Sequence, residues 1–395
     1  MSLPSQHASA RPLTYVALLA VMAILAAAIL ILARGQGPPP PDSWRPGMPL
    51  EASRLKIGLI VTDDGTNPYS QAHIQGLRTV LRRLRLRQSQ LDVRYGVQDY
   101  GQMAFDATTR DLIAHGANVV FSTSWSQLDP CEELAGHFPW VVLANAFGNS
   151  SNGTNCSWYA GRMYEARFLA GILAGARTKS GLIGYVAAKD SGNSEVTRDL
   201  DGFAMGVSLA NPGARVLVGV THNWSDPGSE TAMADELIRA GSDVMAYHAN
   251  TADALLEAAK NGVFAIGFGY DMGPLAPNLV LASVQTNWEV YYNRMVDTIM
   301  DGSFSASPHF SGLETGLVSL AGINSSLNSP AALEMVAIAS RRITSGQLSV
   351  FGGPIETNEG TIVGGEGTTL PDETLIDGLH WYYRNIELLR PQGYF

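Results

Sequence analysis

Short apolar runs alternate with amphipathic stretches along the chain from residue 55 onward. An apolar, β-branched run over 55–62 is typical of a buried strand, and helical periodicity follows it over 69–84. The same alternation continues with predicted strands over 92–97, 118–123 and 140–146 and predicted helices over 103–115 and 130–138. Strands that alternate with helices indicate parallel strands joined by right-handed crossover helices. This half of the chain therefore predicts one doubly wound lobe.

The second half repeats the pattern after a predicted helix over 164–177. Strands are predicted over 182–186, 215–221, 243–248, 263–268 and 279–284, and helices over 195–209, 230–240, 252–261, 289–300 and 330–345. We expect an extended stretch over 310–321 and a final helix over 372–389 after a Gly-rich tail. The predicted fold class is α/β, with two doubly wound parallel-sheet lobes.

The order of these elements gives the expected domain boundaries. Too little chain follows residue 285 for a third domain, so this part is expected to cross back and complete both lobes. The first lobe would hold residues 55–160 and 285–312, and the second lobe would hold residues 161–284 and 313–356. Residues 357–395 would form a C-terminal tail and helix.

An uncharged apolar stretch lies near the N-terminus. It covers Leu13–Ala33, which is 21 residues, and is bounded by Arg11 and Arg34. This length spans a bilayer as a helix and exceeds the apolar core of a cleaved signal peptide, so we predict an uncleaved transmembrane anchor. Residues 1–12 would be a short tail, and the Pro-rich residues 34–54 would be a spacer between membrane and folded body.

Two further features favour a folded body outside the cytoplasm, in the periplasm, at the cell surface or in the secretory lumen. Triplets that fit the N-glycosylation pattern begin at Asn149, Asn152, Asn155, Asn223 and Asn324. The chain has only two cysteines, Cys131 and Cys156. They could form one disulfide across an exported loop pair, or they could remain free thiols.

Composition and motifs exclude several classes of function. The formal charge of -10 and the absence of a long basic run in the folded region argue against nucleic acid as a partner. The sequence contains no phosphate-binding Gly-Lys-Ser/Thr loop, no Gly-x-Ser-x-Gly elbow and no His-Glu-x-x-His, and its eight histidines are scattered. We therefore predict a protein that is not an enzyme and has neither a cofactor nor a metal site.

Polar and aromatic residues follow the predicted strands at their carboxyl ends, where open α/β sheets bind ligands. Aromatic rings at these places can stack on a planar ligand, and amides and carboxylates can form hydrogen bonds with the donors and acceptors at its edge. The candidate binding residues are Asp63, Asn67, Tyr69, Ser124, Trp125, Asn145, Trp224, His248, Tyr270, Asp271 and Asn287.

Several short motifs carry a resemblance to a known family. They are VVFSTS at 119–124, MYEAR at 163–167, GLIGYV at 181–186, NWSDPG at 223–228, YDM at 270–272, NWEVYY at 287–292 and GGPI at 352–355. In order and spacing, residues 55–389 resemble the basic membrane protein family, the purine- and nucleoside-binding lipoproteins that serve ABC transporters.

The resemblance implies a type I periplasmic-binding-protein fold, whose two lobes close by a hinge on a purine base or nucleoside for ABC-type uptake or sensing. It implies an ABC permease or a signalling partner. The ring would stack between Tyr69 or Trp125 and Trp224, and Asp271 would accept a hydrogen bond from the ligand. Nucleoside binders usually have an Asp in place of Gly269 and a Lys near Thr286, so the resemblance favours a base.

Two alternatives stay open at this stage. A nucleoside-processing hydrolase could use Asp63 or Asp64 as a general base or metal ligand. A surface receptor body could keep the fold without a ligand.

Overall fold

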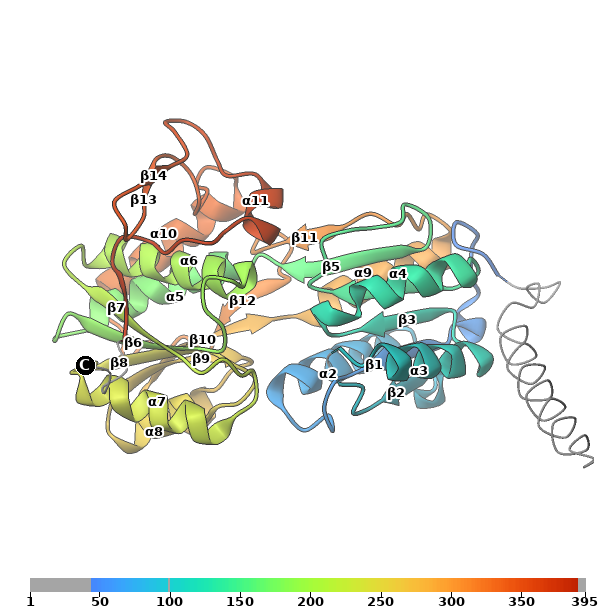
Figure 1. Cartoon of the computed structure of the whole chain (residues 1–395), viewed down its shortest axis with the longest axis horizontal. Coiled ribbons are helices and arrows are strands. Elements are labelled where there is room, and N and C mark those ends of the chain that lie inside the picture. Colours follow the sequence, from blue (N-terminus) through green and yellow to red (C-terminus); the bar gives the residue numbers. More distant parts are fainter. Residues whose placement is uncertain (1–43, 99, 390–395) are drawn as a thin grey trace, which may run out of the picture.

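The computed structural model describes residues 44–98 and 100–389. The predicted anchor over Leu13–Ala33 lies outside these residues. Among the described residues, no helix is both long and apolar enough to cross a membrane. Figure 1 shows two α/β lobes side by side, with the first described residues at the end of lobe 1 that is remote from lobe 2.

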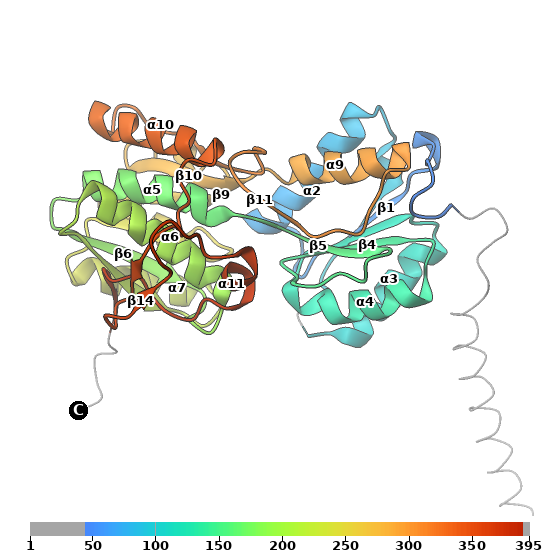
Figure 2. The ribbon, with the colours of Figure 1, turned by 90° about the horizontal axis from the view of Figure 1, so that it is seen from above.

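Lobe 1 is built on a sheet with the strand order β11-β5-β4-β3-β1-β2. Every neighbouring pair in it is parallel. The strands are β1 (Ile57–Ile60), β2 (Leu91–Arg94), β3 (Val119–Ser122), β4 (Val142–Ala146), β5 (Cys156–Gly161) and β11 (His309–Ser311). Helices α2 (Pro68–Arg83) and α9 (Trp288–Asp301) cover one face, and α3 (Gln102–Ala114) and α4 (Leu128–His137) cover the other, as Figure 2 shows.

Lobe 2 is built on a sheet with the order β12-β10-β9-β8-β6-β7-β15. Its strands are β6 (Leu182–Ala187), β7 (Arg215–Val220), β8 (Val244–His248), β9 (Phe264–Gly269), β10 (Val280–Thr286), β12 (Val318–Ala321) and β15 (Ile386–Leu388). All pairs are parallel except β12 with β10. Helices α5 (Met163–Arg177) and α6 (Ser194–Ala210) pack on one face, and α7 (Pro227–Arg239) and α8 (Asp253–Lys260) pack on the other. The predicted α/β fold with parallel sheets is confirmed.

The remaining elements extend lobe 2. Helix α10 (Pro330–Thr344) packs against α5 on its outer side. The short strands β13 (Ile355–Glu356) and β14 (Ile362–Val363) form a small antiparallel pair, and helix α11 (Asp372–Asp377) follows them.

Two parts of the chain differ from the sequence prediction. The prediction missed strand β5, a short run that follows an Asn/Ser-rich loop and mixes aromatic with small residues. The single C-terminal helix predicted over 372–389 is wrong, because α11 ends at Asp377 and the chain then forms β15. The open edge of β7 explains the difference: Val216 N donates to Asn385 O at 2.9 Å, and Leu389 N donates to Val218 O at 2.8 Å.

The described chain crosses between the lobes after β5, after β10 and after β11. Hydrogen bonds hold these crossing segments together. Asn287 donates its backbone N–H to Leu317 O and its side-chain Nδ2 to Gly316 O, both at 2.7 Å. Arg162 donates its backbone N–H to Ser311 O at 2.7 Å and pairs with Glu314 at 2.6 Å. The crossing region is therefore an ordered joint.

Helices α5 and α6 pack so closely that glycine is required at their contact. A Cβ atom on Gly206 would collide with the backbone oxygen of Phe168, and one on Gly171 would collide with that of Phe203. This close approach fixes α6, whose N-terminal turn faces the gap between the lobes.

We predict that Gly206→Ala lowers the free energy of unfolding by about 1–3 kcal/mol, because the added methyl group forces α5 and α6 apart. Urea unfolding followed by circular dichroism measures the change. In α4, a Cβ atom added to Gly136 would have no neighbouring heavy atom within 4 Å outside its own stretch of helix. The control Gly136→Ala should be neutral or should stabilise by up to about 1 kcal/mol. Equal effects of the two substitutions would contradict the close-packing account.

Candidate ligand-binding cleft

A cavity of about 550 Å³ lies between the two lobes. Small-molecule sites typically have volumes of roughly 300–1,000 Å³. Its walls come from the carboxyl ends of strands in both sheets and from the first turns of α2 and α6. The cavity therefore has the size and position of a ligand cleft.

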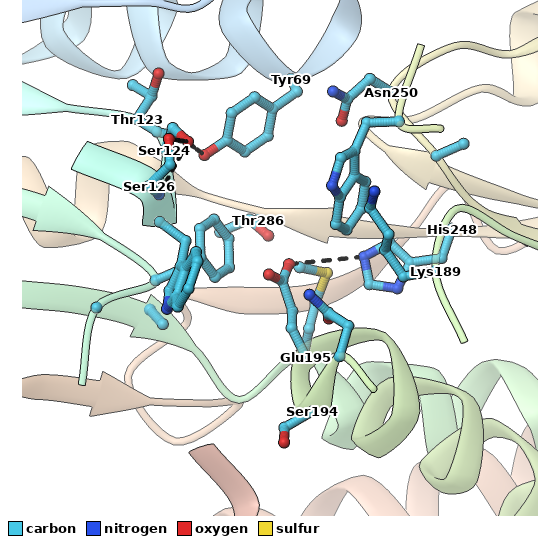
Figure 3. Close-up of a pocket in the computed structure, with 18 of the residues that line it drawn as sticks. Tyr69, Thr123, Ser124, Ser126, Lys189, Ser194, Glu195, His248, Asn250 and Thr286 are labelled. Carbon is cyan, nitrogen blue, oxygen red and sulfur yellow. Dashed lines mark hydrogen bonds and ion pairs between the residues drawn. The ribbon is translucent and has the colours of Figure 1, made fainter. Parts of the chain in front are cut away.

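Tyr69 forms part of the lobe 1 wall. Asn67 caps the N-terminus of α2 by accepting a hydrogen bond from Ser70 N at 2.8 Å, which places Tyr69 in the first turn. The Tyr69 hydroxyl donates to Thr123 O at 2.6 Å, as Figure 3 shows. Its ring packs edge-on against His73, with centroids 4.6 Å apart. Contacts at both ends of the side chain hold the ring at the cleft.

His73 lies beneath this wall and carries no charge near neutral pH. Its ring stacks on Trp288 with centroids 4.3 Å apart, and its Nδ1 lies 2.5 Å from the Tyr292 hydroxyl. Burial lowers the pKa of His73 to about 3. This stack supports Tyr69 from behind.

Phe147 also lines lobe 1 and has a left-handed backbone, with φ of 60°. Such a conformation costs a non-glycine residue about 1 kcal/mol or more and is often found at functional sites. The backbone N–H of Phe147 donates to Tyr159 O at 2.9 Å, which helps to hold this geometry.

Aromatic rings also line lobe 2. Trp224 packs edge-on against His248 with centroids 5.6 Å apart, and Phe268 does so at 4.8 Å. Burial, with Arg167 and Arg198 nearby, lowers the pKa of His248 well below its ordinary value. The imidazole is therefore neutral and packs as a polar ring between two aromatic side chains.

A cluster of buried charges lies behind this lobe 2 wall. Arg167 is fully buried and donates from Nη1 to Tyr247 O at 2.9 Å, while its guanidinium group lies 4.3 Å from the centre of the Phe268 ring. Asp199 is also buried, and burial raises its pKa to about 6. Glu195 lies at the cavity itself, and burial raises its pKa to about 7.

A third wall comes from the C-terminal segment. Ile376 and Asp377 of α11 line the cavity, and Asn149 of lobe 1 donates from Nδ2 to Asp377 Oδ2 at 3.2 Å. The segment is held on α6, since Leu379 N donates to Ser194 Oγ and Tyr383 N donates to Asp201 Oδ1.

The structure brings five of the sequence-predicted site residues to the cavity: Tyr69, Ser124, Trp125, Trp224 and His248. Asn145 lies behind the lining. Its Nδ2 donates to Ser122 Oγ at 2.8 Å and to Ser124 O at 2.7 Å. Asn145 therefore positions the Ser124 loop.

The other predicted residues lie outside the cavity lining for identifiable reasons. Asp63 and Asn67 form the N-terminal turn of α2, where Asn67 Nδ2 donates to Asp63 Oδ2 at 2.6 Å. Asp271 accepts from Gly273 N at 2.9 Å and closes a turn, and the neighbouring Tyr270 is exposed. Asn287 belongs to the interlobe joint.

Sequence reasoning missed Glu195 as a site residue. Glu195 lies in the first turn of α6 and was predicted only as the first residue of that helix. Lys189 and Asn250, which follow β6 and β8, also line the cavity. The sequence signal for Glu195 is its place two residues after Asn193, which caps the helix that follows β6.

The features that suggested export can also be located. Cys131 of α4 and Cys156 of β5 are buried free thiols. Asn155 is buried and donates from Nδ2 to Val141 O at 2.8 Å, so its amide is inaccessible in the folded protein. Within the described residues, no group of His, Cys, Asp and Glu side chains could hold a metal ion.

Residues 56–350 match the family described as PnrA-like ABC transporter substrate-binding proteins. The chain belongs to this family. The membership in the basic membrane protein family that the motifs predicted is thereby confirmed. The chain is a solute-binding protein of the ABC transporter type.

Two named relatives are binding proteins, and a solved structure shares the fold. A purine-binding protein of Brucella abortus is 31% identical over 278 residues, which cover 70% of this chain and 77% of the relative. A putative ABC transporter glucose-binding protein of Haloferax volcanii is 31% identical over 236 residues, covering 60% of this chain and 59% of the relative. An ABC transporter solute-binding protein from Aeropyrum pernix matches with a TM-score of 0.65 at 16% identity, covering 75% and 92% of the two chains. This last likeness shows the fold alone.

The raised pKa of Glu195 predicts a pH-dependent effect on stability. A carboxyl group whose pKa is higher in the folded than in the unfolded state destabilises the fold as pH rises through the folded value, here about 7. Glu195→Gln should therefore stabilise the unliganded protein by about 1 kcal/mol more at pH 8 than at pH 6. Chemical denaturation at both pH values measures this difference. The exposed Glu334, changed to Gln, should show no such difference.

Proposed function

We propose that this protein captures a purine base, or alternatively a nucleoside, in the interlobe cleft for ABC-type uptake or for sensing. The observation that carries the proposal is the set of aromatic rings that both lobes contribute to one cavity. Tyr69, Trp125 and Phe147 come from lobe 1, and Trp224 and Phe268 come from lobe 2. Flat rings on both sides suit a planar heterocycle, which can stack when the lobes close.

The named relatives give this proposal unequal support. The Brucella abortus relative is named a purine-binding protein, whereas the Haloferax volcanii relative is named a putative glucose-binding protein. The aromatic lining agrees with a purine, and Gly269 and Thr286 at the cavity agree with a base. These positions lack the carboxylate and the amine that the sequence resemblance associates with ribose.

The hydrolase alternative finds little support in the site. Asp63 accepts hydrogen bonds from Gly65 N, Asn67 and Ser70 within the turn that begins α2. Asp64 is exposed and accepts from the Thr66 hydroxyl at 2.6 Å. Neither carboxylate lines the cavity, so neither is placed to activate a water molecule beside a bound ligand.

We further propose that Leu13–Ala33 anchors the protein with its folded body outside the cytoplasm. The chain enters lobe 1 at Trp44, which is buried and donates from Nε1 to Met48 O at 2.6 Å. Figure 1 places this entry at the end of lobe 1 away from the cleft. A tether there leaves the cleft and lobe closure free, whether the partner is a permease or a signalling protein.

We expect thermal unfolding of the detergent-solubilised full chain to shift with a purine base. A ligand at about 100 times its dissociation constant should stabilise the fold by roughly 2.7 kcal/mol. The panel holds adenine, guanine, hypoxanthine, their nucleosides, glucose and amino acids. A shift with glucose or an amino acid and with no purine would overturn the ligand assignment, and free base released from a nucleoside would restore the hydrolase.

We expect Trp224→Ala to weaken binding of the stabilising purine by roughly 10- to 100-fold, because base–aromatic stacking contributes about 1–3 kcal/mol. Calorimetric titration measures the affinity. Tyr270→Ala is the matched control, because Tyr270 is an exposed aromatic residue outside the cavity lining. If both variants bind as tightly as the parent, the ligand does not stack in this cleft.

A further inference from the structure

Glu195 presents a carboxyl group to the cleft that has no hydrogen bond to any described residue. Its side chain is 17% exposed, and its Oε1 lies 3.8 Å from His248 Nε2. That distance is too long for a hydrogen bond. Figure 3 shows the group pointing from α6 into the pocket. A largely buried carboxyl group without a hydrogen-bond partner, at the wall of a ligand cavity, is placed to receive a group of the ligand.

The position of this carboxyl group is fixed before any ligand arrives. Asn193 caps α6, accepting from Val196 N at 2.9 Å. One turn further on, Arg198 is buried and donates from Nη1 to Leu375 O at 3.3 Å, which ties the helix to the C-terminal segment. Rigid support of this kind lets a side chain discriminate between ligands.

The surroundings of Glu195 favour its neutral form. Burial raises its pKa to about 7, although Arg198 and Arg167 favour the charged form. His248 supplies no positive charge, because its own pKa lies well below the ordinary value. Asp199 of α6 also favours the neutral form of Glu195. Lys189 and Asp190, after β6, and Asp377 of α11 are further charged groups that line the same cavity. Closure of the lobes on an uncharged ligand would remove further water and favour the neutral form more strongly.

A neutral carboxyl group carries one O–H donor beside one acceptor oxygen. Adenine offers the complementary pair, an exocyclic N–H beside a ring nitrogen, and hypoxanthine offers a ring N–H beside its carbonyl oxygen. Stacking on aromatic walls holds the plane of such a ring but does not distinguish one edge from another. The distinction must come from a polar group in the plane of the ligand.

We propose that Glu195 is the specificity-determining residue of the cleft and pairs, as a neutral carboxyl group, with an adjacent donor and acceptor on the edge of a planar heterocycle. This inference rests on the proposed function and names the side chain that reads the ligand. It also gives Glu195 the hydrogen-bonding role that the sequence resemblance implied for Asp271, whose carboxylate closes a turn outside the cavity.

The test compares adenine binding to the full-length wild type and to two variants at pH 6 and pH 8, by calorimetric titration. Adenine does not titrate in this range. Wild-type affinity should fall about tenfold from pH 6 to pH 8, because the neutral form of Glu195 is depleted. Glu195→Gln keeps one donor and one acceptor at every pH, so its affinity should stay near the wild-type value at pH 6 and should not change with pH. Glu195→Ala should bind about 10- to 100-fold more weakly than wild type at pH 6.

Glu230→Gln is the matched control for pH. Burial raises the pKa of Glu230 to about 7 as well, but Glu230 lies outside the cavity lining and accepts from Thr251 Oγ1 at 2.7 Å. This variant should keep the wild-type affinity and its pH dependence.

Several results would overturn the inference. Glu195→Gln that binds as weakly as Glu195→Ala would mean that the charged carboxylate is required. A pH dependence that survives in Glu195→Gln would assign the proton to another group, such as Asp199. If wild type binds adenine and Glu195→Ala binds it equally well, only this inference fails. If wild type binds no purine, the proposed function fails and the inference falls with it.

Discussion

The direction of the parallel strands at the interlobe crossings is the constraint on which the rest of the structure depends. Strands β5, β10 and β11 each leave their own sheet at its carboxyl end and carry the chain into the other lobe. The carboxyl edges of the two sheets must therefore face each other. Because side chains that follow parallel strands gather at that edge, the crossings bring two half-sites together. Asn287 and Arg162 hold the crossing segments, so the joint and the cleft are parts of one arrangement.

Lobe 2 contains buried charged groups behind the cleft, and these groups lower the stability of its fold. Arg167 and Asp199 are buried, and the Asp199 carboxylate oxygens and Arg167 Nε have no hydrogen-bond partner among the described residues. Groups of this kind destabilise a fold when an apolar side chain of the same size could replace them. Their position directly behind Glu195 and His248 agrees with the general finding that perturbed titratable groups gather at functional sites. In lobe 1, the Tyr69 hydroxyl donates to Thr123 O, and His73 Nδ1 lies 2.5 Å from the Tyr292 hydroxyl.

Much of the fold could be predicted from the sequence, because apolar runs and helical periodicity mark elements that are buried in the expected way. The strands β1, β3, β4, β6 and β8 are buried throughout, and such strands read as continuous apolar runs. Strand β15 could not be found this way, since its formation depends on the free edge of β7 and not on its own pattern.

The site was less predictable, for a reason visible in particular residues. The rule that strand ends face the ligand found Tyr69 and Trp224 but also selected Asp63 and Asp271, which serve their own turns. Short polar side chains can satisfy a local backbone group as readily as a ligand, and the sequence does not say which they do. Glu195 reaches the cavity from the first turn of α6, as Tyr69 does from the first turn of α2, but it was interpreted only as the start of a helix.

Helix α11 gives the cleft a wall that belongs to neither sheet. The family match covers residues 56–350, and beyond it Ile376 and Asp377 line the cavity and Leu375 accepts a hydrogen bond from Arg198. These residues belong to a peripheral strap that packs on the outside of lobe 2. Substitutions there can reshape the ligand site without disturbing either sheet or the joint between the lobes. The ligand site can in this way be altered while the two-lobed frame stays the same.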